Sequence, residues 1–314
     1  MQATLPLLFL NVLVFVHSMI LRGKHVPVEE APSWMVSFHT EDEKVFNCGG
    51  TLISPHIVHT AAHCLKKADD DNWIRLTLND YKADVHEDRE LKRQSQDWFI
   101  RTRRHLEDDK HDDYGLIFLK EAVPVCEEHN NKTLMAPIIV DSSIFPNETT
   151  VFEPHNKACH LMGWGMNEKG EYDHVMQIAK IKKLYTIRGE IVVMRYKDDA
   201  RACNGDSGSP LICNVNGIPV MMGNVAGGVA MDNEARDAVE NAETDFERCE
   251  LRRDIYAFIT RQMPVLEEQI KKRKLWKEFV DTQKRCVKMY QKKNEGQWIH
   301  EDKIVSAKKI SKEH

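Results

Sequence analysis

Short apolar runs separated by turn-forming residues fill most of the first 230 positions of the chain. The stretch SWMVSFHT, residues 33–40, alternates apolar and polar side chains as a half-buried strand does. The stretch GTLISPHIVHTAAHC predicts two short strands interrupted at Ser54-Pro55. Many short strands with no regular alternation of helices predict an all-β sandwich or barrel. Further runs of this kind begin at Tyr114, Cys159, Ile178, Gly189, Pro210 and Ile218.

Helical periodicity is confined to the C-terminal part of the chain. In residues 256–270 apolar side chains recur every three or four positions, and residues 271–289 continue this spacing with many more charges. We therefore expect the main domain to end near Ile270. The acidic stretch 231–248 lies between strand signals and predicts an inserted loop with one or two helical turns.

The N-terminus predicts a secretory signal peptide, residues 1–18. Residues 4–16 are almost all apolar, too short to span a bilayer but suited to a signal h-region, although no Lys or Arg precedes them. The alternative is a buried N-terminal strand, which the lack of alternation disfavours. The expected organisation is thus a signal peptide, one domain over residues 19–270, and a basic extension over residues 271–314.

A secretory route would place the eight cysteines in disulfides. None of them forms a CxxC pair, so the spacing does not indicate a metal site. The tripeptides that begin at Asn131 and Asn147 match glycosylation sequons, which also occur by chance.

Charge is unevenly distributed along the chain. The net charge of −5 does not suggest a nucleic-acid partner. Residues 271–314 contain 14 Lys or Arg and 6 Asp or Glu, which leaves 30 against 43, a net charge of −13, on the rest. This asymmetry indicates either pairing within the molecule or an acidic partner. The alternative is a solvated, partly helical tail.

Three short motifs contain residues that could activate a hydroxyl nucleophile. TAAHC offers His63, HDDYGLIFLK offers Asp113 at a strand entrance, and CNGDSGSP offers Ser207. Gly205 and Ser207 could direct backbone N–H groups into one oxyanion pocket. Each residue alone is weak evidence, because a lone histidine is usually structural and an aspartate before a strand is usually a cap. The order His, Asp, Ser, each in its own motif, is far more specific.

On these motifs the chain resembles the trypsin/chymotrypsin family of serine endopeptidases, over roughly residues 20–270. TAAHC, DYGLIFL and GDSGSP resemble the family's three catalytic motifs, and GWG at Gly163 is a further marker. The resemblance implies two six-stranded antiparallel β-barrels with the site in the cleft between them. It also implies that His63 is the general base, Asp113 fixes the imidazole tautomer, and Ser207 attacks the carbonyl.

The resemblance further implies a disulfide scheme. Its three pairs are Cys48–Cys64 beside the histidine, Cys159–Cys213 in the second barrel, and Cys203–Cys249 beside the nucleophile. Cys126 and Cys286 remain. They either pair and bind the tail to the body or stay free, and the even cysteine count favours pairing.

The activation signal departs from the family pattern. In the family an apolar N-terminus is freed, and its ammonium pairs with the aspartate before the nucleophile, here Asp206. The segment ILRG, which begins at Ile20, matches this N-terminus, but Met19 rather than Arg or Lys precedes it. We therefore do not expect trypsin-like activation at this bond. Cleavage after Ser18 would leave only Met19 to remove, which suggests that there is no true propeptide.

The primary specificity pocket departs as well. Arg201 stands where trypsin-like members have an aspartate, and Asp254 and Gly228 fall at further positions of the same pocket. A buried arginine is costly unless it is paired, so we expect an Arg201–Asp254 salt bridge and no preference for Arg or Lys substrates. If Arg201 stayed free instead, it would favour acidic side chains.

Three further changes affect the cleft. Val225 is followed by Ala-Gly-Gly where the family has Ser-Trp-Gly, which removes an indole wall, and Ser209 replaces the second Gly of GDSGGP. The acidic insertion should overhang the pocket entrance. Its seven carboxylates between Asp232 and Glu247 would meet Arg201, the basic tail or only solvent.

The sequence supports two functions. The first is a secreted serine endopeptidase that needs no cofactor, acts on proteins or peptides, is open to protein inhibitors, and has neither a nucleic-acid partner nor a membrane span. The second is a catalytically inactive or weak homologue that binds or regulates a partner through the same cleft. The complete triad favours the first, whereas the altered pocket and activation signal support the second.

Overall fold

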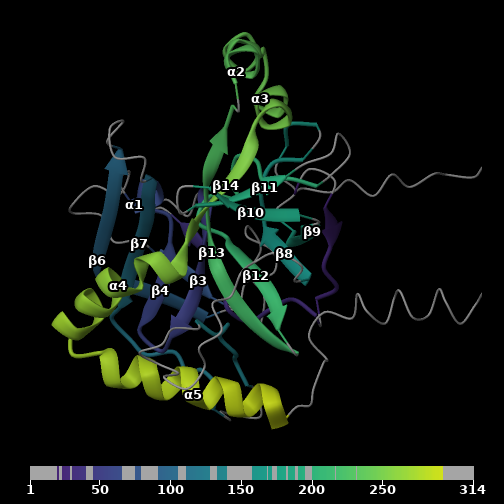
Figure 1. Cartoon of the computed structure of the whole chain (residues 1–314). Coiled ribbons are helices and arrows are strands. Elements are labelled where there is room, and N and C mark those ends of the chain that lie inside the picture. The colour runs from purple at the N-terminus through teal and green to yellow at the C-terminus, as the bar shows by residue number, and fades with distance from the viewer. Residues whose placement is uncertain are drawn as a thin grey trace, which may run out of the picture.

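A computed structural model describes most of the body of the chain. The signal peptide predicted at residues 1–18 and both sequons, at Asn131 and Asn147, lie outside the described residues. The fold is mostly β, with two antiparallel sheets side by side and helices at both ends of the molecule (Figure 1). The described residues are 20, 23–28, 30–39, 45–65, 75–78, 91–104, 111–127, 133–139, 158–167, 169–171, 175–181, 183–187, 190–194, 200–215, 217–230 and 232–292.

The first sheet has six strands and closes on itself, because β5 pairs back with β2. Its turn at Ser54-Pro55 was predicted correctly, since β3 ends at Ser54 and β4 begins at Ile57. Proline cannot donate to a strand ladder, so it suits this turn. In order around the sheet the strands are β2 (Met35–His39), β3 (Val45–Ser54), β4 (Ile57–Thr60), β7 (His111–Leu119), β6 (Leu91–Arg104) and β5 (Arg75–Leu78).

The second sheet has eight strands, all paired antiparallel. The apolar run from Ile178, read as one strand, forms both β9 and β10. The pairings among the described strands give an open order, so the second six-stranded barrel stays a prediction. In order the strands are β1 (Lys24–His25), β9 (Gln177–Ile181), β8 (Ala158–Gly163), β12 (Pro210–Val215), β13 (Ile218–Val229), β14 (Arg253–Phe258), β11 (Glu190–Met194) and β10 (Lys183–Ile187).

The acidic insertion forms a helical hairpin rather than a loop with a few turns. Helix α2 (Asn233–Glu240) begins at Asp232, whose carboxylate accepts a hydrogen bond from the Ala235 N–H at 2.7 Å. Helix α3 (Asp245–Leu251) begins at Thr244, which forms a capping box with Glu247. These caps satisfy N–H groups that the first turn of each helix leaves open.

The C-terminal periodicity belongs to three elements. Its first residues, up to Phe258, complete β14, and α4 (Ile259–Lys272) follows directly. The helix then stops, because Lys274 adopts a left-handed backbone conformation with φ of 61°. Helix α5 (Trp276–Lys292) starts two residues later and runs along the end of the molecule opposite the α2–α3 hairpin (Figure 1).

Helix α5 is docked on the body by its apolar side. Phe279, Cys286 and Tyr290 belong to the same buried core as the first sheet. The amide of buried Gln283 accepts a hydrogen bond from the Ile139 N–H at 2.7 Å and donates to the carbonyl of Ile53 at 3.0 Å. This part of the predicted extension is therefore packed as tightly as the strands. No helix within the described residues has both the length and the apolar character required to cross a membrane.

The amide of Gln283 tests this docking. Gln283→Ala should lower the free energy of unfolding by about 2–4 kcal/mol, because it leaves the buried Ile139 N–H without an acceptor. Gln291→Ala, at an exposed position of the same helix, should change it by less than about 0.5 kcal/mol. Urea unfolding measures both variants, and equal effects would contradict the docking.

Candidate active site

His63 and Asp113 form a tight pair at the edge of the first sheet. His63 lies on α1 (Ala62–Leu65), directly after β4, and Asp113 lies on β7. The ring Nδ1 of His63 is 2.6 Å from Oδ2 of Asp113, and the His63 backbone N–H donates to Oδ1 at 2.9 Å. Since a carboxylate only accepts, Nδ1 carries the proton and Nε2 is left as the basic nitrogen.

Ser207 sits on a buried turn in the second half of the site. Eight of the eleven residues 200–210 are buried, whereas Ser207 is partly exposed. Two backbone bonds shape the turn: Asp206 N–H donates to the Cys203 carbonyl at 3.1 Å, and Ser209 N–H donates to the Asp206 carbonyl at 3.0 Å. The hydroxyl is thus presented at the surface by a rigid support.

This turn is pressed against the first sheet. The Gly49 N–H donates to the Ser207 carbonyl at 2.8 Å, and the Thr60 hydroxyl donates to the Gly49 carbonyl at 2.8 Å. A Cβ at Gly208 would collide with both the Gly49 oxygen and the Thr60 hydroxyl. Glycine is therefore required at this position by the close approach of the two halves as well as by its φ of 80°.

The N–H groups of Gly205 and Ser207 are available. In the described part of the chain neither donates a hydrogen bond, and Gly205 has a φ of 98°. No hydrogen bond joins the Ser207 hydroxyl to His63 among these residues. Catalytic hydrogen bonds are often long without substrate and tighten when it binds.

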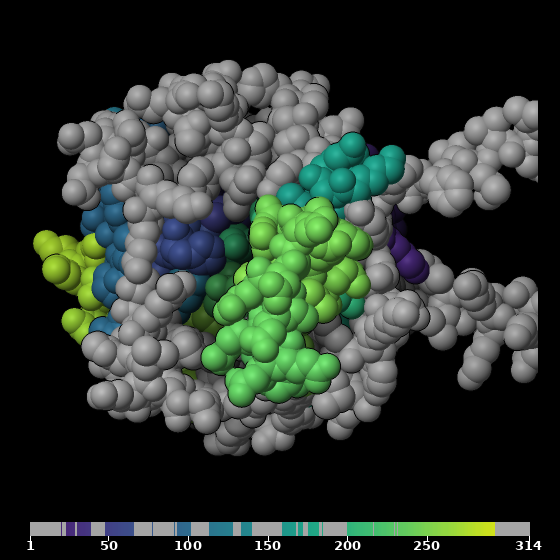
Figure 2. Space-filling model, turned by 90° about the horizontal axis from the view of Figure 1, so that it is seen from above, coloured from purple at the N-terminus to yellow at the C-terminus, as the bar shows by residue number. Residues whose placement is uncertain are grey.

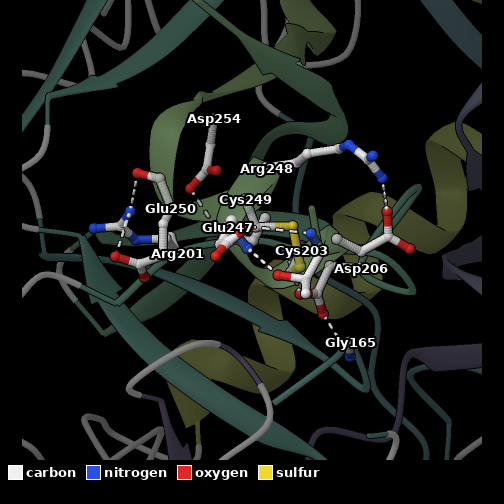
Figure 3. The surroundings of a disulfide bond; sticks show 12 residues. Gly165, Arg201, Cys203, Asp206, Glu247, Arg248, Cys249, Glu250 and Asp254 are labelled. Carbon is white, nitrogen blue, oxygen red and sulfur yellow. Dashed lines mark hydrogen bonds and ion pairs between the residues drawn. A yellow bond between two sulfur atoms is a disulfide. The ribbon is translucent and has the colours of Figure 1, made fainter. Parts of the chain in front are cut away.

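Asp206 is completely buried beneath the turn. Its carboxylate accepts hydrogen bonds from the Gly165 N–H at 2.8 Å and the Cys203 N–H at 3.0 Å (Figure 3). A Cβ at Gly165 would overlap this carboxylate, which gives the GWG motif a physical reason. Burial raises the pKa of Asp206 from 3.8 to about 7, although the two N–H groups oppose this effect.

The N-terminal strand is paired with the second sheet. Ile20 is fully buried, and β1 pairs with β9 of the second sheet, with Lys24 opposite Ile178. Among the described residues no cation pairs with Asp206. The ammonium–carboxylate contact expected from the family pattern stays a prediction, since it requires a chain that begins at Ile20.

All eight cysteines are disulfide-bonded. Cys126–Cys286, which the sequence had left open, ties α5 to the segment after β7. The sulfurs of Cys48 and Cys64 lie near the His63 ring in an arrangement that could hold a metal ion, but their disulfide leaves no thiolate to do so. The other pairs are the expected Cys159–Cys213 and Cys203–Cys249.

Arg201 and Asp254 are both buried, and both make polar contacts. Arg201 is buried, as predicted, and its Nη1 lies 2.5 Å from the carbonyl oxygen and 3.4 Å from Oε2 of Glu250 (Figure 3). The buried carboxylate of Asp254 accepts a hydrogen bond from the Ala202 N–H at 3.1 Å. Arg201 therefore forms an ion pair with Glu250, which the sequence did not suggest, and the expected Arg201–Asp254 pair stays a prediction. Gly228 lies opposite Asp254 in the β13–β14 ladder and is exposed.

The α2–α3 hairpin is attached to the turn that contains Ser207. Cys249 of α3 is bonded to Cys203, and Phe246 packs against Met166 and this disulfide. Seen from above, the hairpin stands in front of the second sheet, beside the first (Figure 2).

Two residues near the site were missed in the sequence. Buried Asn224 donates from Nδ2 to the Asp113 carbonyl at 3.2 Å and so links β13 to the other sheet. The sequence feature that could have indicated this residue is an amide side chain inside the apolar run of residues 218–230. Glu250 gave no signal, because its role depends on how α3 ends over Arg201.

Comparison with known proteins agrees with this geometry. A family model described as trypsin matches residues 20–243. The chain belongs to the trypsin family of serine proteases. The matched segment contains His63, Asp113 and Ser207 and ends inside the α2–α3 hairpin.

Several snake venom proteins are similar to this trypsin-family chain. The thrombin-like enzyme gloshedobin of Gloydius shedaoensis is 31% identical over 68% of this chain and 80% of its own length. The serine protease ussurin of Gloydius ussuriensis is 30% identical over 58% and 75%. Vaa serine proteinase homolog 1 of Vipera ammodytes ammodytes is 29% identical over 62% and 73%.

The pKa of Asp206 predicts a pH dependence of stability. This applies to a chain in which residues still precede Ile20. Between about pH 4 and 7 the Asp206 carboxyl of the native state then keeps its proton, whereas the same carboxyl in the unfolded state has lost it. The free energy of unfolding should therefore fall as the pH rises through this window, by an amount on the order of a few kcal/mol. Urea unfolding between pH 4.5 and 8 measures this slope.

Asp206→Asn should remove this component, since an amide does not titrate. Asp237→Asn, at an exposed position of α2, should leave the slope unchanged. If the Asp206→Asn chain showed the same slope as the unaltered chain, the titration would have to be assigned elsewhere.

Proposed function

We propose that this protein is a secreted serine endopeptidase that hydrolyses peptide bonds through His63, Asp113 and Ser207. The observation that carries the proposal is the 2.6 Å contact between His63 Nδ1 and Asp113, formed beside a buried turn that exposes Ser207. Membership of the trypsin family supports these roles.

The proposed reaction proceeds through an acyl-enzyme. The Ser207 Oγ attacks the substrate carbonyl carbon and transfers its proton to Nε2 of His63, and Asp113 stabilises the resulting imidazolium. The N–H groups of Gly205 and Ser207 bind the oxyanion. His63 then protonates the leaving amine, which departs and leaves an ester on Ser207. Water gives a proton to His63 and attacks this ester, and His63 returns the proton to the Ser207 oxygen as the carboxylic acid product is released.

Secretion is part of the proposal. The four disulfides are typical of an oxidising compartment. Similar proteins are named snake venom serine proteases. The apolar run of residues 4–16 would direct the chain to that route.

The pocket contacts support a specificity unlike that of trypsin. The buried guanidinium of Arg201 would repel an arginine or lysine side chain of a substrate. Its pairing with Glu250 also keeps it from an acidic side chain. We therefore propose that the pocket disfavours charged residues on the amino side of the cleaved bond.

A second candidate function is binding without catalysis through the same cleft. It is favoured by the occupied guanidinium of Arg201 and by the lack of a Ser207–His63 hydrogen bond among the described residues. Both functions predict a folded protein, so they differ only in the reactivity of Ser207.

Reaction with a fluorophosphonate separates these functions. The folded chain should be labelled at Ser207, Ser207→Ala should abolish labelling, and Asp113→Asn should slow it by about 10³–10⁴-fold. Ser209→Gly, which restores the family residue two positions away, serves as the matched control and should keep the label. A folded chain that remains unlabelled would favour the binding protein.

A peptide library tests the pocket. The unaltered chain should not cleave mainly after arginine or lysine. Glu250→Gln should raise cleavage after acidic residues by about tenfold, because it removes a carboxylate that pairs with Arg201. Glu247→Gln, an exposed change on the same helix, should have no such effect. Cleavage mainly after arginine and lysine would contradict both the assignment of Arg201 to the pocket and the proposed repulsion of positively charged substrate side chains.

A further inference from the structure

The outer face of α5 carries a row of lysines. Lys277, Lys284, Lys288 and Lys292 are exposed and follow one another at intervals of seven, four and four residues. At 100° per residue these positions share one side of the helix, opposite buried Phe279 and Cys286. At 1.5 Å per residue the row is about 22 Å long.

Within the part of the chain that the structure describes, the lysine row is mostly unpaired with acidic side chains. Within the described residues Lys284, Lys288 and Lys292 form no ion pair or hydrogen bond, and the one pair in the row is Lys277 with Asp281 at 3.3 Å. The acidic α2–α3 hairpin lies at the other end of the molecule (Figure 1). The pairing between tail and insertion considered from the sequence is therefore ruled out for α5.

The row is also held in a fixed position. Cys126–Cys286, the Gln283 amide bonds, and the Tyr290 hydroxyl, which donates to the Ala136 carbonyl at 2.9 Å, immobilise the helix from its inner side. Lysines four residues apart repel one another, and a bound anion would relieve this repulsion. Since the helix is already ordered, binding would not require ordering of its backbone.

We propose that the lysine row of α5 binds a linear sulfated polysaccharide. A linear polymer with regularly repeated anionic groups matches a straight row of cations. Insertion into a membrane would need an apolar face, and that face of α5 is already packed on the body. The large hydrophobic side chains exposed among the described residues are Val28 and Leu251, and neither lies on α5.

Other polyanions fit less well. Single-stranded nucleic acid is bound by stacking on aromatic side chains, and the row contains only lysines. An acidic protein partner would need a buried apolar centre to its interface, which the row does not offer. The proposal concerns a surface distinct from the candidate active site and holds whether or not Ser207 is reactive.

Binding of the full chain to heparin over a range of NaCl concentrations tests this proposal. Lys284→Gln, Lys288→Gln and Lys292→Gln together should weaken binding by about 10–100-fold at 0.1 M salt and lower the slope of log Kd against log salt by about two to three. The matched control removes three exposed cations elsewhere, with Lys24→Gln, Lys169→Gln and Arg236→Gln, and should change binding less than about twofold.

The same experiment can overturn the proposal. It fails if the chain does not bind heparin at 0.1 M salt, or if the control triple variant loses as much affinity as the α5 variant. It also fails if phosphatidylserine vesicles or a DNA duplex bind as tightly as heparin. Unchanged circular dichroism and thermal unfolding of both variants show that any loss arises from charge and not from unfolding.

Discussion

The hydrogen bond from the Gly49 amide to the Ser207 carbonyl is the contact on which the rest of the site depends. Gly49 belongs to the same closed sheet that carries His63 and Asp113, whereas Ser207 belongs to a turn of the second sheet. This bond therefore positions Ser207, the proposed nucleophile, relative to the half of the site that contains His63 and Asp113. Gly208 makes it possible, because any side chain there would push the two sheets apart. Asn224 adds a second link, to the carbonyl of Asp113.

On its other side the turn rests on a carboxylate that lacks a counter-charge. Asp206 is buried with two N–H donors, and among the described residues no cation accompanies it. Burial of an unpaired carboxylate is costly, which is why its pKa rises to about 7. A positive charge placed beside this carboxylate would therefore stabilise it. In the family pattern the ammonium of a freed N-terminus supplies that charge, and the corresponding Ile20–Asp206 contact stays a prediction for this chain.

Local patterns predicted much of the fold, and long-range packing explains the failures. The turn at Ser54-Pro55 could be located because proline restricts the backbone only of itself and the residue before it. Strand β6 was missed because its sequence is largely polar and alternates poorly, and only its pairing with β5 and β7 makes it a strand. The His63–Asp113 pair followed from motifs, whereas the partner of Arg201 depends on where α3 ends, which no short pattern encodes.

The two charged additions to the sheets are attached by the same physical device. Helix α3 buries none of its side chains completely, whereas α5 buries Phe279, Cys286 and Tyr290 in the core. In both helices a disulfide adds a covalent link to the body, Cys203–Cys249 for α3 and Cys126–Cys286 for α5. Because the two attachments lie at opposite ends, the carboxylates of α2–α3 lie beside the candidate active site and the lysine row of α5 lies at the other end of the molecule (Figure 1). A polyanion that approached this molecule would therefore be steered to α5 and away from Ser207.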